Sequence, residues 1–108
     1  MPRVAILASY NGSGFVALYE AMQSGKLSIE IPLIISNNSS ATVLEKAAFF
    51  GIDHFVLNAK TETNPDIAIE RLLDKYRCDF VFLSGYMKKV GTNITQNFKV
   101  INSHPALL

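Results

Sequence analysis

Residues 4–15 read VAILASYNGSGF, and this stretch decides the fold. Its first part, Val4 to Ala8, is a continuous apolar run, which is typical of a parallel strand covered by helices on both faces. Asn11-Gly12-Ser13-Gly14 then breaks the run and begins a helix. That helix carries a stripe of apolar residues at i, i+3, i+4 and i+7, namely Phe15, Leu18, Tyr19 and Met22. A strand that leads directly into an amphipathic helix is the building unit of a parallel sheet.

Short apolar runs and helical periods alternate from there to the end of the chain. We expect further strands at residues 29–35, 54–57, 80–83 and 100–102. Two helices between them have recognisable starts, because Thr42-x-x-Glu45 fits a capping box and Asn64-Pro65 offers an N-cap followed by proline. Gly25 and Gly51 are the expected helix stops.

The apolar positions of these helices predict which of their sides are buried. The second helix is expected to bury Leu44, Ala47 and Ala48, and the third carries Ile69, Leu72, Leu73 and Tyr76 at helical spacing. A short helical turn is expected at residues 92–98. The pattern predicts one α/β domain over residues 1–108, with an open, mostly parallel sheet and helices on both faces.

Composition excludes several classes of function. The chain has 108 residues and a net charge of +1, and its ten basic and nine acidic residues form no long run of one sign, so no nucleic-acid-binding patch is expected. No apolar stretch approaches the roughly 20 residues that cross a membrane. Met1 leads directly into a strand-like run, and we expect a cytoplasmic protein. Cys78 is the only cysteine, which excludes an internal disulfide and predicts a small buried thiol on a strand.

Three groups of functional side chains follow predicted strands, where open parallel sheets bind their ligands. The first is Asn11-Gly12-Ser13-Gly14, at a strand-to-helix turn. Its glycines allow close backbone approach, and the amides of residues 12–14 with the Ser13 hydroxyl suit a phosphate. The pattern is neither a dinucleotide fingerprint nor a Walker A loop. An ordinary tight turn with Ser13 as the N-cap is equally compatible with it.

The second group is the loop Tyr86-Met87-Lys88-Lys89-Val90, which follows Gly85. Aromatic, thioether and aliphatic groups can line a slot for a flat ring, and backbone groups can bond the edge of that ring. Alternatively, Tyr86 and Met87 anchor the loop on the core, and the lysines are only solvated.

The third group is Asn102-Ser103-His104-Pro105. Asn102 and His104 are two residues apart on an extended segment, so their side chains are expected on the same side. A carboxamide can donate to a developing oxyanion, and an imidazole can act as a general acid or base. The alternative is a structural histidine in a loop before proline, which is also how we interpret His54.

Together these groups resemble the phosphoribosylglycinamide formyltransferase family. The resemblance runs along the whole chain, from the Asn-Gly-Ser turn through Ile35-Ser36-Asn37 and Leu83-Ser84-Gly85-Tyr86-Met87 to the final segment. That segment, residues 101–108, is the most specific, since the family carries Asn-x-His-Pro-Ser-Leu-Leu there.

The resemblance implies a Rossmann-like fold and an enzyme of purine biosynthesis and one-carbon metabolism (EC 2.1.2.2 type). Such an enzyme transfers formyl from 10-formyltetrahydrofolate to the amine of glycinamide ribonucleotide, without a metal. Gly12 and Ser13, within the Asn11–Gly14 turn, would hold the substrate phosphate. The loop from Tyr86 through Lys88 and Lys89 to Val90 would line the folate pocket. Asn102 and His104 would stabilise the tetrahedral intermediate and assist proton transfer.

The sequence departs from the family at three places. Gly14 replaces an asparagine, and Lys88 replaces an arginine. The third departure concerns the family's catalytic aspartate, which belongs to an Asp-Gly-Gly segment well downstream, and no such segment occurs in residues 1–108. We therefore expect a truncated N-terminal half, weakly active or inactive by itself.

Two other interpretations stay open at the level of sequence. The chain could belong to methionyl-tRNA formyltransferase or formyltetrahydrofolate deformylase, which share the Asn-x-His segment, although the Asn-Gly-Ser turn favours the purine enzyme. It could also be an inactive α/β module that only binds ligands. In that case an exposed sheet edge would favour self-association into a homo-oligomer.

Overall fold

Five parallel strands form one sheet in the computed structural model, which describes residues 1–103. Their order is β3-β2-β1-β4-β5. The strands are β1 (Arg3–Leu7), β2 (Glu30–Ser36), β3 (Asp53–Val56), β4 (Phe80–Ser84) and β5 (Lys99–Ser103). The helices are α1 (Ser13–Gln23), α2 (Val43–Phe50), α3 (Pro65–Lys75) and the short α4 (Thr92–Thr95). The predicted Rossmann-like α/β class is confirmed.

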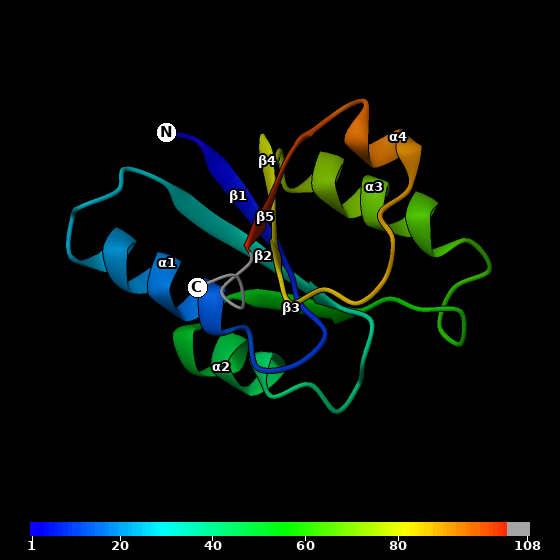
Figure 1. The fold of residues 1–108 in the computed structure, drawn as a ribbon, viewed down its shortest axis with the longest axis horizontal. Coiled ribbons are helices and arrows are strands. Elements are labelled where there is room, and N and C mark those ends of the chain that lie inside the picture. The colour runs from blue at the N-terminus through cyan, green and yellow to red at the C-terminus, as the bar shows by residue number, and fades with distance from the viewer. Residues whose placement is uncertain (104–108) are drawn as a thin grey trace.

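The helices cover both faces of the sheet. Figure 1 shows α1 and α2 on one side and α3 and α4 on the other. Each pair of helices covers a separate hydrophobic core. The core on the α1–α2 side contains Phe15, Val43 and Ala47. The core on the α3–α4 side contains Ile69, Leu73 and Ile94. None of the helices in residues 1–103 is long and apolar enough to span a membrane.

The central strand β1 is buried from Val4 to its end. Ala5, Ile6 and Leu7 are fully buried, and their side chains alternate between the two cores. The strand pairs with β2 on one edge and with β4 on the other. The sheet therefore reverses its winding direction between β1 and β4, where doubly wound sheets bind ligands beyond the carboxyl ends.

The starts of α2 and α3 show one wrong and one correct prediction. Asn64 caps α3 as predicted, with its side-chain oxygen accepting from the Ile67 amide at 3.3 Å. The predicted capping box at Thr42 and Glu45 does not form, because the Thr42 backbone is already helical and its side chain makes no capping bond. The Val43 amide instead donates to the Tyr10 carbonyl at 3.0 Å.

The buried side of α2 also differs from the prediction. Ala48 is exposed and Leu44 is half-buried, whereas Val43, which was not singled out, is fully buried in the same core as Phe15 of α1. Cys78 is buried as expected, but it lies in the connection between α3 and β4 and not on a strand.

The Cys78 thiol should react slowly with disulfide reagents in the folded protein. Burial raises its pKa to about 11, although the nearby Arg3 charge opposes the shift. The thiol form is thus favoured in the folded state, so its contribution to stability is complete below the ordinary pKa of 9.0 and is lost as pH rises toward about 11. At pH 8 we expect disulfide reagents to label the native chain at least about 100-fold more slowly than the urea-unfolded chain. Equal labelling rates would contradict this assignment.

Candidate functional site at the carboxyl edge of the sheet

The predicted groups within residues 1–103 follow three neighbouring strands at one edge of the sheet. The Asn11–Gly14 turn follows β1, the Tyr86–Val90 loop follows β4, and Asn102 lies near the end of β5. Parallel strands end at the same edge, so these segments lie near one another although they are up to 91 positions apart in sequence (Figure 1). His104, the other predicted catalytic residue, lies outside the described residues.

The Gly12 backbone makes the first turn possible. Gly12 is the N-cap of α1 and adopts the left-handed conformation, with φ +64° and ψ +42°. A Cβ added there would lie 2.5 Å from Cγ2 of Val43, at the start of α2. Glycine is therefore required twice, for its positive φ and for the close approach of α2. Ser13 is the first helical residue and not the N-cap.

The amides of this turn are only partly used inside the protein. The Ser13 amide donates to Asn11 Oδ1 at 3.1 Å, and the Phe15 amide donates to Ser84 Oγ at 3.1 Å. Within residues 1–103, the amides of Gly12 and Gly14 and the exposed Ser13 hydroxyl have no internal partner. An anion at the turn would meet these groups at the positive end of the α1 dipole.

Lys46 adds a positive charge that the sequence analysis did not single out. It lies on α2, and its Nζ donates to the Asn11 carbonyl at 2.6 Å. Its only sequence signal is its position near the start of the second helix. The close packing of α2 against the turn at Gly12 brings this ammonium group to the turn.

Gly14 faces the ends of two strands. A Cβ at this position would lie 3.0 Å from Ser84 Oγ and 3.1 Å from Ser103 Oγ. A side chain at position 14 would thus meet β4 and β5, and two serine hydroxyls fill the space beside the glycine.

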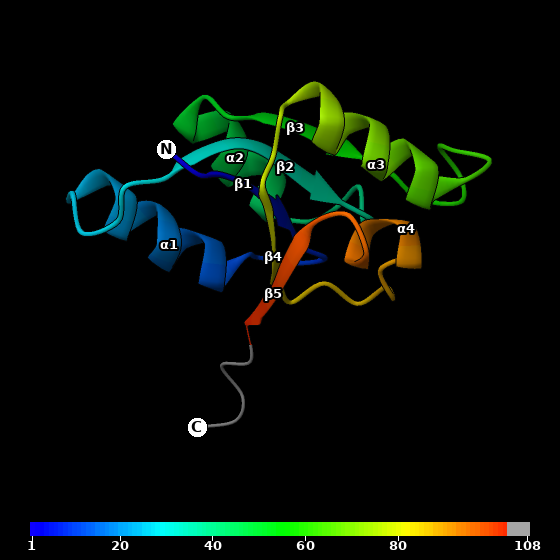
Figure 2. The same ribbon diagram turned by 90° about the horizontal axis from the view of Figure 1, so that it is seen from above.

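The Tyr86–Val90 loop is anchored at both ends and exposed in the middle. Tyr86 and Val90 pack against the core on the α3 side, and burial, followed by the Asp66 charge, raises the pKa of the Tyr86 phenol. Met87 is 63% exposed, and both lysines are exposed. Figure 2 shows the connection running from the end of β4 to α4, away from α1. The loop borders a cavity of about 200 Å³, which is also lined by Asn58 and Asp66.

Asn102 is exposed and lies beside Leu83 in the β4–β5 pairing. Val100, two residues earlier, packs into the core on the α3–α4 side, so the alternation along the strand directs Asn102 to that side as well. Ser103 faces the opposite side, toward Gly14. The end of β5 thus lies between the α1 turn on one face and the Tyr86–Val90 loop on the other.

Three serines at strand ends were missed by the sequence analysis. Among residues 1–103 they are the buried polar residues: Ser9 two residues after β1, Ser36 at the end of β2, and Ser84 at the end of β4. A signal was present, since each is the first polar residue after an apolar run on a central strand.

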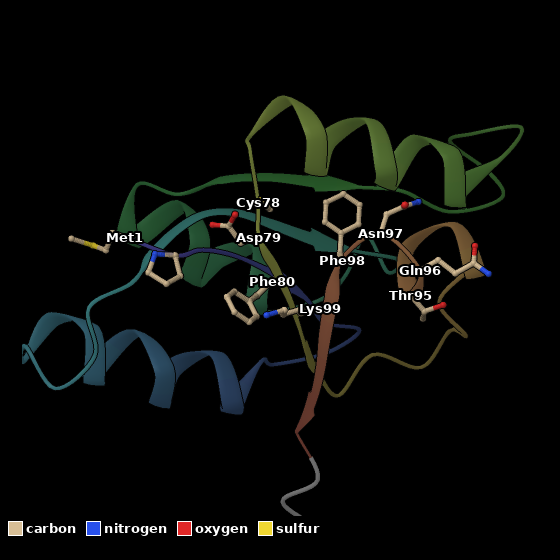
Figure 3. Close-up of a pocket in the computed structure, with 10 residues that line it drawn as sticks. Met1, Cys78, Asp79, Phe80, Thr95, Gln96, Asn97, Phe98 and Lys99 are labelled. Atoms are coloured by element: carbon tan, nitrogen blue, oxygen red, sulfur yellow. The ribbon is translucent and has the colours of Figure 1, made fainter.

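A large groove lies at the other end of the strands. It measures about 870 Å³ and is bounded by Pro2, Asp79 and Phe98, which precede β1, β4 and β5 (Figure 3). Figure 3 shows Lys99 beside the Phe80 ring, with Nζ 5.7 Å from the ring centroid. Because ligand sites in open parallel sheets lie at the carboxyl ends, the groove does not compete with the site above. In residues 1–103, no three His, Cys, Asp or Glu side chains gather in a way that could hold a metal ion.

Comparison with known proteins identifies the family. A formyl transferase family model matches residues 2–108. The chain belongs to the formyl transferase family. It is 36% identical to the trifunctional purine biosynthetic protein adenosine-3 of Homo sapiens, over 98% of this chain and 11% of that protein. It is 29% identical to the phosphoribosylglycinamide formyltransferase of Bacillus subtilis, over 100% of this chain and 58% of that protein.

A solved structure of a glycinamide ribonucleotide transformylase has the same fold. Glycinamide ribonucleotide transformylase 1 from Symbiobacterium toebii superimposes with a TM-score of 0.90 at 28% identity, over 97% of this chain and 52% of that one. The chain thus spans about half the length of these bacterial formyl transferases.

Gly12→Ala tests the close approach of α2 to the turn. Gly25→Ala is the matched control, because Gly25 also has a positive φ, +80°, but no atom within 4 Å of an added Cβ. We expect the control to lose about 1 kcal/mol of unfolding free energy from backbone strain alone. Gly12→Ala should lose at least about 1 kcal/mol more, because overpacking is added. Equal losses in urea unfolding would contradict the steric argument.

Proposed function

We propose that this chain carries the substrate-phosphate and folate-binding half of a phosphoribosylglycinamide formyltransferase. The observation that carries the proposal is the meeting of the α1 turn, the Tyr86–Val90 loop and Asn102 at one sheet edge in a member of the formyl transferase family. The names of the relatives favour the purine enzyme over the tRNA formyltransferase and the deformylase.

The phosphate of glycinamide ribonucleotide binds at the start of α1 in this proposal. The amides of Gly12 and Gly14, which have no partner within residues 1–103, and the Ser13 hydroxyl supply hydrogen bonds. Lys46 supplies a charge beside the turn. Asn11 shapes the turn by holding the Ser13 amide, which a phosphate oxygen can take over.

The folate co-substrate binds on the other side of the edge, along the Tyr86–Val90 loop. The residues fit such a group, because within residues 1–103 the amides of Lys88, Lys89 and Val90 have no internal acceptor. Exposed amides suit the polar edge of a pterin, and the Met87 side chain offers apolar surface. When bound, 10-formyltetrahydrofolate supplies the formyl group.

Asn102 lies between the two binding segments, and in this proposal it acts together with His104. The Asn102 carboxamide donates a hydrogen bond to the formyl oxygen, where negative charge grows as the substrate amine adds. His104, two residues further along the chain, moves protons, since histidine is the side chain that changes charge nearest to neutral pH. We place the reaction in the cytoplasm and require no metal for it.

A direct assay tests the proposed activity. A version of the protein that continues into an Asp-Gly-Gly segment should formylate glycinamide ribonucleotide with 10-formyltetrahydrofolate. The 108-residue chain should do so weakly or not at all, because no Asp-Gly-Gly occurs in it. Both should be assayed with methionyl-tRNA as an alternative acceptor. Robust turnover by the 108-residue chain would show that the aspartate is dispensable, and a preference for the tRNA would replace the purine assignment.

His104→Ala in the longer version should lower the rate at least about 100-fold, the usual scale for an acid–base group. His54→Ala is the matched control, because His54 lies on β3 and its Nδ1 contacts the Ile52 carbonyl at 2.9 Å. The control should keep its rate, and both variants should unfold at similar urea concentrations. An unchanged rate in His104→Ala would make that histidine structural.

A further inference from the structure

Ser9 is the buried residue that connects the two predicted binding segments. It lies two residues after the end of β1, is only 2% exposed, and lies three positions before Gly12. Its backbone amide donates to the Gly85 carbonyl at 3.3 Å, and its carbonyl accepts from Asn38 Nδ2 at 3.0 Å. The main chain of Ser9 therefore joins the ends of β1, β2 and β4.

The Ser9 hydroxyl makes two further bonds with defined directions. It donates to Asn37 Oδ1 at 2.6 Å and accepts from the Met87 amide at 2.8 Å. Because the Ser9 hydroxyl donates its hydrogen to Asn37 Oδ1, a lone pair of Oγ can accept the hydrogen bond from the Met87 amide. Asn37 is itself held, since its carbonyl accepts from Asn58 Nδ2 at 2.9 Å. The hydroxyl thus stands between a fixed acceptor and the middle of the Tyr86–Val90 loop.

The Met87 bond has no substitute inside the described chain. Met87 is 63% exposed, so side-chain packing does not fix this point of the loop. Among residues 1–103, its amide is the only one from Tyr86 to Val90 with an internal acceptor. Without Ser9 Oγ the loop would be held by Tyr86 and Val90 at its ends, with the main chain between them free to turn.

We infer that Ser9 is a positioning residue for folate binding. Its hydroxyl fixes the main chain at Met87, and this orients the unpaired amides of the next three residues toward the ligand. The inference rests on the proposed function and adds to it a residue that touches neither substrate. A positioning role also explains why the Ser9 hydroxyl is buried between Asn37 and Met87 and is not exposed at the Asn11–Gly14 turn.

Ser9→Ala and Ser36→Ala form a matched pair. Both remove a buried serine hydroxyl at or just beyond the end of a central strand, but within residues 1–103 Ser36 Oγ bonds only to the backbone of Asn38, at 3.1 and 3.2 Å. In the 108-residue chain, amide hydrogen exchange at Met87 should become at least about tenfold faster in Ser9→Ala and stay within about twofold in Ser36→Ala. General destabilisation would speed exchange at Met87 in both variants.

Binding measurements separate positioning from stability. By calorimetry, Ser9→Ala should bind tetrahydrofolate at least about tenfold more weakly than the wild-type chain, while its affinity for ribose 5-phosphate stays within about twofold. Ser36→Ala should match the wild-type chain with both ligands. Equal tetrahydrofolate affinity in Ser9→Ala, or unchanged exchange at Met87, would overturn the inference.

Asn37 provides a second pair if Ser9→Ala does not fold. Asn37→Asp keeps an acceptor for the Ser9 hydroxyl and should preserve slow exchange at Met87. Asn37→Ala removes the acceptor, frees the hydroxyl to rotate and should speed that exchange. Identical amide exchange at Met87 in the two Asn37 variants would contradict the positioning role of Ser9. A wild-type chain that protects Met87 but binds no tetrahydrofolate would instead contradict the proposed function, and with it the folate part of this inference.

Discussion

The burial of β1 on both faces is the constraint on which the rest of the structure depends. From Ala5 to Ala8 no side chain reaches solvent, because β2 and β4 cover its edges and helices cover its faces. A strand in this position must be apolar until it ends. Polar chemistry is therefore confined to the residues after it, and the neighbouring parallel strands bring their own ends to the same place. The site lies where the core stops.

This constraint also explains the small polar residues at the edge. Ser9, Ser36 and Ser84 are buried. The hydroxyls of Ser9 and Ser36 bond to loops that leave the sheet, and the Ser84 hydroxyl accepts from the Phe15 amide in the first turn of α1. A buried polar group is tolerated only when it is hydrogen-bonded, and within residues 1–103 no buried side-chain polar atom lacks a partner. The serines thus end the core and connect the loops that follow it. Larger side chains would separate those loops.

The two sides of the edge offer different chemistry. On the α1 side, a helix start, Lys46 and amides without a partner in residues 1–103 suit an anion. On the α3 side, an exposed loop with apolar groups, and with amides that are likewise unpaired in the described part of the chain, suits a flat polar ring. The end of β5 lies between them and turns Asn102 toward the loop and Ser103 toward the turn. A group transferred between a phosphorylated acceptor and a folate would pass this strand end, which is consistent with membership of the formyl transferase family.

The sequence by itself determined the elements and the kind of chemistry. Periods of apolar residues predicted the strands, three longer helices and the α/β class, since these patterns depend only on which side of each element is buried. The glycine turn, the loop after β4 and Asn102 stood out because their residue types follow apolar runs. Only the tertiary structure decided the rest: that α2 starts against Tyr10 and not through a Thr42 capping box, that Lys46 reaches the turn, and that Ser9 holds Met87. These are contacts between residues 33 to 78 positions apart, and no local pattern encodes them, because they depend on the order and packing of the strands.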